Sequence, residues 1–164
     1  MKVLIVFSGK YGSSQMYANR LVHAFGDGSQ AVDAKQAKKT DLKEWDNIIV
    51  GGGVYMGKTP RSLKSFLKKG LKTLKNKKIG LFVCCASKAE DSHITEYFEK
   101  NFPSELVEKA VVKSAFPGGQ VMNEKAGFVY KKMYDQMNKL SDEEINTFIV
   151  DAVTTFSAGN DGAH

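Results

Sequence analysis

No stretch of this 164-residue sequence approaches the ~20 consecutive apolar residues of a membrane-spanning helix. The N-terminus has only Lys2 ahead of a short apolar run, which is too little for a secretory signal. Internal repeats and low-complexity segments are also missing. We therefore expect a single cytoplasmic domain over residues 1–164, with a flexible tail over residues 157–164.

Cysteine is scarce: Cys84 and Cys85 are the only two, and they are adjacent within an apolar run. Neighbouring cysteines rarely form a disulfide, and the chain has neither a CxxC nor a His-x-x-x-His pattern. Two buried thiols are expected. A thiol lying beside a ligand remains the alternative, because the run ends next to a candidate loop.

Arginine is scarce as well, since Arg20 and Arg61 are the only two and the net charge of +6 comes from lysine. A basic chain favours an anionic partner, such as nucleic acid, a membrane surface or an acidic protein. Sequence-specific nucleic-acid readers prefer arginine for bidentate base contacts. We therefore expect no nucleic-acid partner.

Apolar, β-branched runs alternate with amphipathic segments along the chain. Continuous apolar runs are typical of strands buried on both faces of a parallel sheet. The expected strands are Val3–Phe7, Gln30–Asp33, Asp46–Val50, Ile79–Cys84 and Val107–Ala115. Periodicity predicts helices over residues 14–25, 60–75, 91–101 and 123–139. Ser141 and Glu144 form a capping box that predicts the start of a last helix.

This order of elements predicts an α/β fold with a doubly wound five-stranded parallel sheet, strand order 2-1-3-4-5 and helices on both faces. Ligands bind such sheets beyond the carboxyl ends of the strands, where the strand order reverses. That rule selects three loops for closer reading, at residues 8–14, 51–59 and 85–91.

The first loop, SGKYGSS, brings glycine amides and hydroxyls to the start of a helix, which is typical of an anion site. The alternative is a plain turn in which Ser13 and Ser14 only cap the helix. The Walker pattern G-x-x-x-x-G-K-[ST] is missing, so a nucleoside triphosphatase is not expected.

The second loop, GGGVYMGKTP, has glycines that admit a flat ring close to the backbone, with Tyr55 and Met56 as apolar walls. Met56 stands where a G-x-G-x-x-G fingerprint requires glycine, so dinucleotide binding through this motif is not expected. A glycine-rich strand exit with a surface tyrosine is the alternative. In the third loop, Ala86 and Ser87 suit either a close ligand or a plain surface loop.

Three segments, VLIVFSGKYGSSQMYA, WDNIIVGGGVYMGKTPRSLKSFLKK and KKIGLFVCCAS, together resemble a flavodoxin domain. They resemble most the branch that contains menaquinone-dependent protoporphyrinogen dehydrogenase. The resemblance extends to about residue 156 and implies a flavodoxin-like fold with FMN as cofactor. It implies that the first loop holds the phosphate and that a glycine-rich turn with an aromatic holds the flavin ring.

The resemblance and the loops together predict that FMN contacts Ser8, Lys10, Tyr11, Gly12, Ser13, Ser14, Gly52, Gly53, Val54, Tyr55, Met56, Gly57, Ala86 and Ser87. The three serine hydroxyls and the amides of residues 9–14 would hold the phosphate, and Lys10 would compensate its charge. Backbone groups of Gly53 and Gly57 would contact the polar edge of the ring. No catalytic side chain and no metal are expected, since the flavin would carry the chemistry.

Two departures from the family bear on function. Carrier flavodoxins are typically acidic, whereas this chain is basic, and the segment after the fifth strand holds Tyr130 and Tyr134 but no arginine of the dehydrogenase type. The leading hypothesis is an FMN-dependent oxidoreductase of the protoporphyrinogen or quinone type. It implies a redox partner, a quinone or porphyrinogen-like substrate, and peripheral contact with an anionic membrane through residues 64–78. The alternatives are a one-electron carrier and a flavin-free interaction module.

Overall fold

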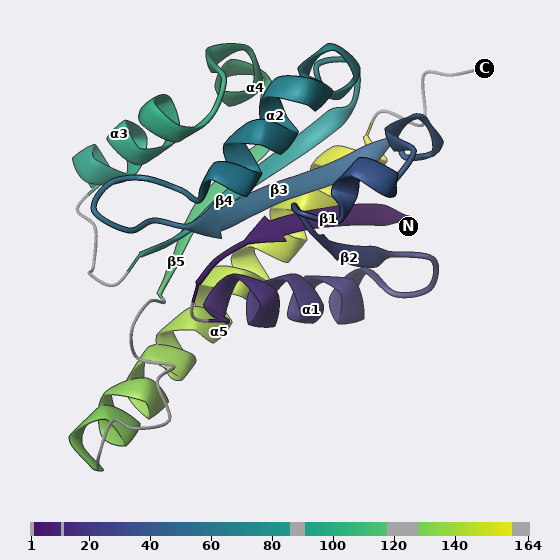
Figure 1. The fold of residues 1–164 in the computed structure, drawn as a ribbon. Helices are drawn as coiled ribbons and strands as arrows, with labels where there is room; N and C mark the ends of the chain where they lie inside the picture. The colour runs from purple at the N-terminus through teal and green to yellow at the C-terminus, as the bar shows by residue number, and fades with distance from the viewer. Residues whose placement is uncertain (1, 11, 86–90, 118–127, 159–164) are drawn as a thin grey trace.

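A computed structural model describes the backbone of residues 2–10, 12–85, 91–117 and 128–158, with their side chains except at 91–93, 117 and 128–141. One five-stranded parallel sheet lies between two layers of helices (Figure 1). Its strand order is β2-β1-β3-β4-β5, which confirms the predicted topology.

The strands are β1 (Val3–Ser8), β2 (Gln30–Asp33), β3 (Asn47–Gly53), β4 (Lys78–Cys85) and β5 (Val112–Pro117). The central strands are buried along almost their whole length, as their continuous apolar character predicts. β3 runs three residues beyond its predicted end, because Gly52 still pairs with Ser8 and Gly53 with Cys84. Three of the glycines assigned to the second loop, Gly51, Gly52 and Gly53, therefore belong to the sheet.

The helices are α1 (Ser13–Phe25), α2 (Arg61–Leu74), α3 (Asp91–Asn101), α4 (Ser104–Lys109) and α5 (Phe128–Ser157), with short 3-10 turns η1 (Ala37–Lys39) and η2 (Leu42–Glu44). The strand expected from Val107 was wrong over its first residues. The segment forms α4 instead, which buries Leu106 against the core.

The predicted helix start at Ser141 was also wrong, because α5 continues unbroken through it. The 30 residues of α5 contain neither glycine nor proline, so nothing in the chain ends the helix before the capping-box pattern. In Figure 1 the first turns of α5 extend past the sheet at the end where the strands finish. Residues 123–127 and 159–164 lie outside the described residues.

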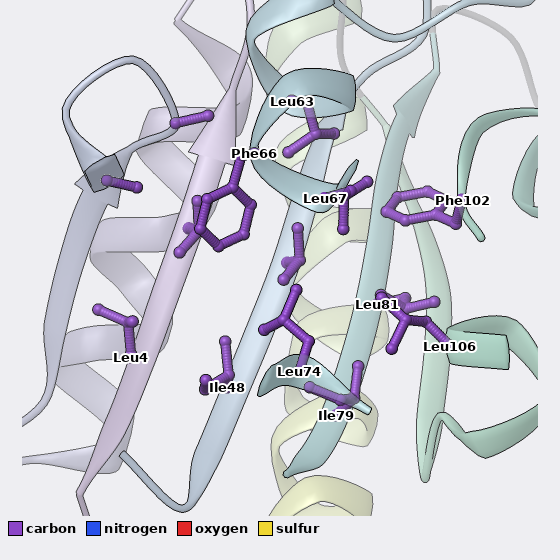
Figure 2. Close-up of a cluster of buried hydrophobic side chains, with 14 of the residues drawn as sticks. Leu4, Ile48, Leu63, Phe66, Leu67, Leu74, Ile79, Leu81, Phe102 and Leu106 are labelled. Atoms are coloured by element: carbon purple, nitrogen blue, oxygen red, sulfur yellow. The ribbon is translucent and has the colours of Figure 1, made fainter. Parts of the chain in front are cut away.

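α2, α3 and α4 cover one face of the sheet, and α1 and α5 cover the other (Figure 1). On the first face the apolar side of α2 packs onto β1, β3 and β4, as Figure 2 shows for Leu63, Phe66, Leu67, Leu74, Leu4, Ile48 and Leu81. On the second face Phe116 lies 4.8 Å from Tyr17 and 5.5 Å from Phe148 between ring centroids. In the described part of the chain, no helix combines the length and apolar character needed to cross a bilayer.

Candidate functional site

The predicted loops follow β1, β3 and β4, which are neighbours in the sheet and end at the same edge. Residues 9–12 connect β1 to α1, and residues 54–60 connect β3 to α2. Tyr11, Ala86 and Ser87 were predicted to contact the cofactor, and all three lie outside the described residues. The site can therefore be built from the first two loops and the end of β4.

The first loop turns into α1 at Gly12, whose φ of 86° is left-handed. A Cβ at Gly12 would have no atom within 4 Å, so the space beside this residue is open. Gly12 occupies the N-cap position of α1 and no side chain caps the helix. The first-turn N–H groups of a helix lack intrahelical partners and carry the positive end of its dipole. This end of α1 can therefore receive an anion.

Ser13 and Ser14 are the first two residues of α1 and are 2% and 0% exposed. The alternative in which they only cap the helix was wrong, because neither occupies the cap position. Ser14 Oγ donates a hydrogen bond to Cys84 Sγ at 3.7 Å. Within the described residues, Ser13 Oγ is buried and makes no hydrogen bond. Buried hydroxyls are normally paired, so this one indicates room for an acceptor that a ligand could supply.

Ser8 ends β1 with its hydroxyl turned toward α2, where its Oγ lies 2.7 Å from Ser62 Oγ in the first turn of that helix. The pair ties the start of the first loop to the end of the second. Ser62 was not singled out from the sequence, because a serine one residue after the start of a lysine-rich helix carries no motif. Ser8 thus stands at the site with its hydroxyl already engaged.

The three glycines of β3 make room for the protein's own side chains. A Cβ on Gly51 would lie 2.2 Å from the Phe82 ring, and one on Gly52 would lie 2.8 Å from Leu63 Cδ2. A Cβ on Gly53 would lie 2.5 Å from Tyr55 Oη. Gly53 therefore lets the tyrosine fold back over the end of its own strand. Val54 follows, half-buried, and its N–H donates to the Cys84 carbonyl at 2.9 Å.

Residues 55–58 form a two-residue hairpin turn. Tyr55 N–H donates to the Lys58 carbonyl at 2.8 Å, and Lys58 N–H donates back at 3.0 Å. The central residues both have positive φ, 51° at Met56 and 79° at Gly57. Gly57 takes this conformation without cost, but Met56 holds it under strain. The Met56 side chain is fully exposed, at 102%.

Tyr55 connects this turn to the first loop. Lys10 N–H donates to Tyr55 Oη at 2.8 Å, and Lys10 Nζ lies 5.8 Å from the centre of the tyrosine ring. The aromatic predicted as a ring wall therefore lies across the space between the two loops. Its hydroxyl oxygen accepts a hydrogen bond from the Lys10 N–H, which is one of the amides predicted to hold the phosphate.

The two cysteines end β4 beneath the loops, buried and unbridged, as predicted. Burial raises the pKa of Cys84 from 9.0 to about 12, although nearby hydroxyls of Ser14 and Ser13 oppose the rise. Burial likewise raises the pKa of Cys85 to about 11. Both groups are neutral thiols near pH 7 and poor nucleophiles. Among the described residues, no three His, Cys, Asp or Glu side chains gather into a metal-binding group.

One functional candidate was missed entirely. Asn101 at the end of α3 is 4% exposed and its amide contacts the second loop. Forty-two residues separate it from Thr59, its partner in that loop. No local pattern links two residues so far apart, so only the fold brings them together.

A family model described as a flavodoxin domain matches residues 4–147. A comparison with curated proteins gives no match. Several solved structures match over nearly their full length, among them three flavodoxins. A short-chain flavodoxin associated with a non-canonical PDU bacterial microcompartment is 15% identical, with a TM-score of 0.61, covering 95% of this chain and 99% of that one. A flavodoxin from Streptococcus pneumoniae is 13% identical, with a TM-score of 0.59, covering 94% and 99%.

The third, a Fusobacterium nucleatum flavodoxin bound to flavin mononucleotide, is 13% identical, with a TM-score of 0.56, covering 94% of this chain and 98% of that one. Longer proteins match as well. The chain spans 36% of the rubredoxin oxygen:oxidoreductase of Desulfovibrio gigas, with a TM-score of 0.46. At these identities the three flavodoxin structures demonstrate a common fold with this chain.

Proposed function

Because this chain belongs to the flavodoxin domain family, we propose that it binds FMN and works as a flavin-dependent oxidoreductase. The observation that carries the proposal is the buried, unpaired hydroxyl of Ser13 at the start of α1. A phosphate group offers the acceptor oxygens that this hydroxyl and the first-turn amides lack. The open space beside Gly12 leaves room for such a group.

The residues present fit the rest of the cofactor. Lys10 is exposed beside the first loop, and its ammonium group would offset phosphate charge. Tyr55 and Met56 stand on the second loop, where an aromatic and a thioether would contact a flat ring. When bound, FMN supplies the electron-transfer chemistry. The chain's own part is to hold the phosphate, orient the ring and limit its contact with water.

The neutral thiols suit this role. Cys84 and Cys85 stay protonated at the end of β4 because burial raises the pKa of both. A protonated thiol does not add to an electrophilic ring as a thiolate would. We propose that they serve as packing groups beneath the cofactor.

For the reaction class, we propose a quinone or porphyrinogen-like substrate. The support is electrostatic: residues 58–78 contain no Asp or Glu, and α2 exposes Arg61, Lys64, Lys68, Lys69 and Lys72. Arg61 begins α2 directly after the second loop. A propionate-bearing substrate, or an anionic membrane that delivers a quinone, would be attracted to such a face. A one-electron carrier with an acidic redox partner is the competing proposal.

The test is an FMN titration of flavin-free protein, followed by turnover with protoporphyrinogen and with quinones. Quenching of flavin fluorescence that saturates at one FMN per chain supports the proposal, and rapid oxidation of the reduced protein by a quinone supports the enzyme. Exchange of electrons with redox proteins, without turnover of small substrates, favours the carrier. A protein that leaves added FMN unquenched is a flavin-free module, and the proposal fails.

A further inference from the structure

Asn101 is a buried side-chain amide that makes four hydrogen bonds across two elements. Its Oδ1 accepts from Thr59 N–H at 2.9 Å and from Thr59 Oγ1 at 3.4 Å. Its Nδ2 donates to the Gly57 carbonyl at 3.0 Å and to the Tyr97 carbonyl, within α3, at 2.9 Å. Both ends of the amide are therefore used, and three of the four bonds hold the loop that follows β3.

The segment held in this way has little else to fix its position. Met56 and Gly57 form the tip of the hairpin turn, and both carry positive φ. Met56 is fully exposed, so its side chain packs against nothing that would anchor the tip. Asn101 forms hydrogen bonds with the carbonyl of Gly57 and with the N–H and hydroxyl of Thr59, on the side of the turn that returns to α2.

The other side of the same turn reaches the first loop. Tyr55 is bound to Lys58 by both ladder hydrogen bonds, and its hydroxyl accepts from Lys10 N–H. A shift of residues 57–59 would therefore move Tyr55 and, through its hydroxyl, the amide at position 10. A chain of hydrogen bonds therefore connects α3 to the turn, and the turn to the candidate phosphate loop.

We propose that Asn101 is a positioning residue that holds the Tyr55–Lys58 turn in the position that FMN binding requires. This inference rests on the proposed function, because the turn matters to catalysis only if FMN lies against it. Asn101 does not contact the cofactor itself. It acts by satisfying the Thr59 N–H, which would otherwise be buried without a partner, and the partly buried Gly57 carbonyl.

The chain offers a matched control in Asn76, which lies just after α2. Its Nδ2 donates to the Lys72 carbonyl at 3.2 Å, four residues earlier, as Asn101 Nδ2 does to Tyr97. Asn76 is exposed, and within the described part of the chain its hydrogen bonds go to the Lys72 and Thr73 carbonyls of α2 rather than to the loop after β3. Asn101→Asp and Asn76→Asp therefore make the same chemical change, but only Asn101→Asp alters hydrogen bonds to the Tyr55–Lys58 turn.

The experiment measures FMN affinity of wild-type protein, Asn101→Asp and Asn76→Asp at pH 8 and at pH 5. The carboxylate of Asn101→Asp still accepts from Thr59 but faces the Gly57 and Tyr97 carbonyls with no proton to donate. We expect FMN affinity roughly 10-fold or more below wild type at pH 8. At pH 5 a protonated carboxyl donates again, so the gap to wild type should narrow several-fold. The FMN affinity of Asn76→Asp should equal that of wild type at both pH values.

A second measurement needs no cofactor. In flavin-free Asn101→Ala the Thr59 amide loses its acceptor, so its hydrogen exchange should accelerate at least tenfold while amides in β1 and β4 keep their rates. Phe102→Leu, which thins the neighbouring core, serves as a control for general destabilisation. It should leave the Thr59 amide protected relative to the rest of the sheet.

The outcomes separate the two proposals. If wild-type protein binds FMN and Asn101→Asp binds it equally well at pH 8, the positioning role is overturned while the proposed function stands. An affinity loss in Asn101→Asp that persists unchanged at pH 5 also overturns it, because general loosening would not be rescued by a proton. If wild-type protein binds no FMN, the proposed function fails and the inference fails with it.

Discussion

Replacing Ser13 with alanine is expected to change stability and ligand affinity in opposite directions. The Ser13 hydroxyl is buried at the start of α1 and makes no hydrogen bond in the described structure. In the flavin-free protein it is a desolvated polar group whose neighbouring polar group is the weakly accepting Cys84 thiol. In the FMN complex that we propose, it gains a phosphate oxygen.

The magnitudes follow from this change of partner. Removing a buried, unsatisfied hydroxyl relieves about 1–2 kcal/mol, and alanine adds about 0.5 kcal/mol through helix propensity. For a chain of this length the flavin-free protein should melt roughly 3–10 °C higher. A hydrogen bond to a charged group contributes about 1.5–3 kcal/mol. FMN affinity should therefore fall by roughly 10- to 100-fold.

The assay pairs thermal unfolding of the flavin-free protein with an FMN fluorescence titration. Ser65→Ala in the middle of α2 is the control, since it shares the helix-propensity gain at a half-buried site. It should leave FMN affinity unchanged. Two results would refute the reasoning: a Ser13→Ala protein that melts lower than wild type, or one that binds FMN as tightly.

Three further predictions concern neighbouring groups. Tyr55→Phe frees the Lys10 amide for the phosphate, so FMN should bind roughly 2- to 10-fold more tightly. A titration with Tyr97→Phe as control checks this, and weaker binding would contradict it. Burial holds the pKa of Cys84 near 12, while unfolded thiols ionise from about pH 9.0, so the free energy of unfolding should decline between pH 9 and pH 12. Urea unfolding at pH 8 and pH 10 should show a steeper decline for wild type than for Cys84→Ala; equal slopes would count against it. Met56→Gly removes backbone strain at φ 51° and should raise the free energy of unfolding by up to about 1 kcal/mol. Urea unfolding should then show a higher midpoint, and a lower midpoint would contradict the prediction.

The sheet could be predicted because its strands are apolar on both faces and short. Runs such as Val3–Phe7 leave few alternatives once they alternate with helices. Around Val107 the same signal was ambiguous, since a short apolar run does not distinguish a strand from one turn of buried helix. At Ser141 the local capping pattern was present, but helical residues on both sides and the packing of Ile145 and Phe148 overrode it.

The location of the candidate site could be predicted from the sequence, but most of its side-chain contacts could not. Topology alone locates the loops after β1 and β3, and Ser13 and Ser14 of the first loop do lie at the start of α1. The direction of each hydroxyl depends on tertiary neighbours. Ser8 pairs with Ser62 and Ser14 with Cys84, and neither partner is near in sequence. Gly52 and Gly53, which we predicted to contact FMN, also leave room for the side chains of Leu63 and Tyr55.

The core that α5 completes sets the time at which the chain can fold during synthesis. This core joins the first strand, through Val3 and Ile5, to the last helix, through Phe148 and Phe156. Lys78 Nζ at the start of β4 also donates to the Phe156 carbonyl at 2.6 Å. Until α5 has emerged from the ribosome, α1 alone covers this face of the nascent sheet, and the part that α5 packs against is open to water. Stalled chains that lack α5 should therefore stay protease-sensitive, and the emergence of α5 should be the step at which protection appears.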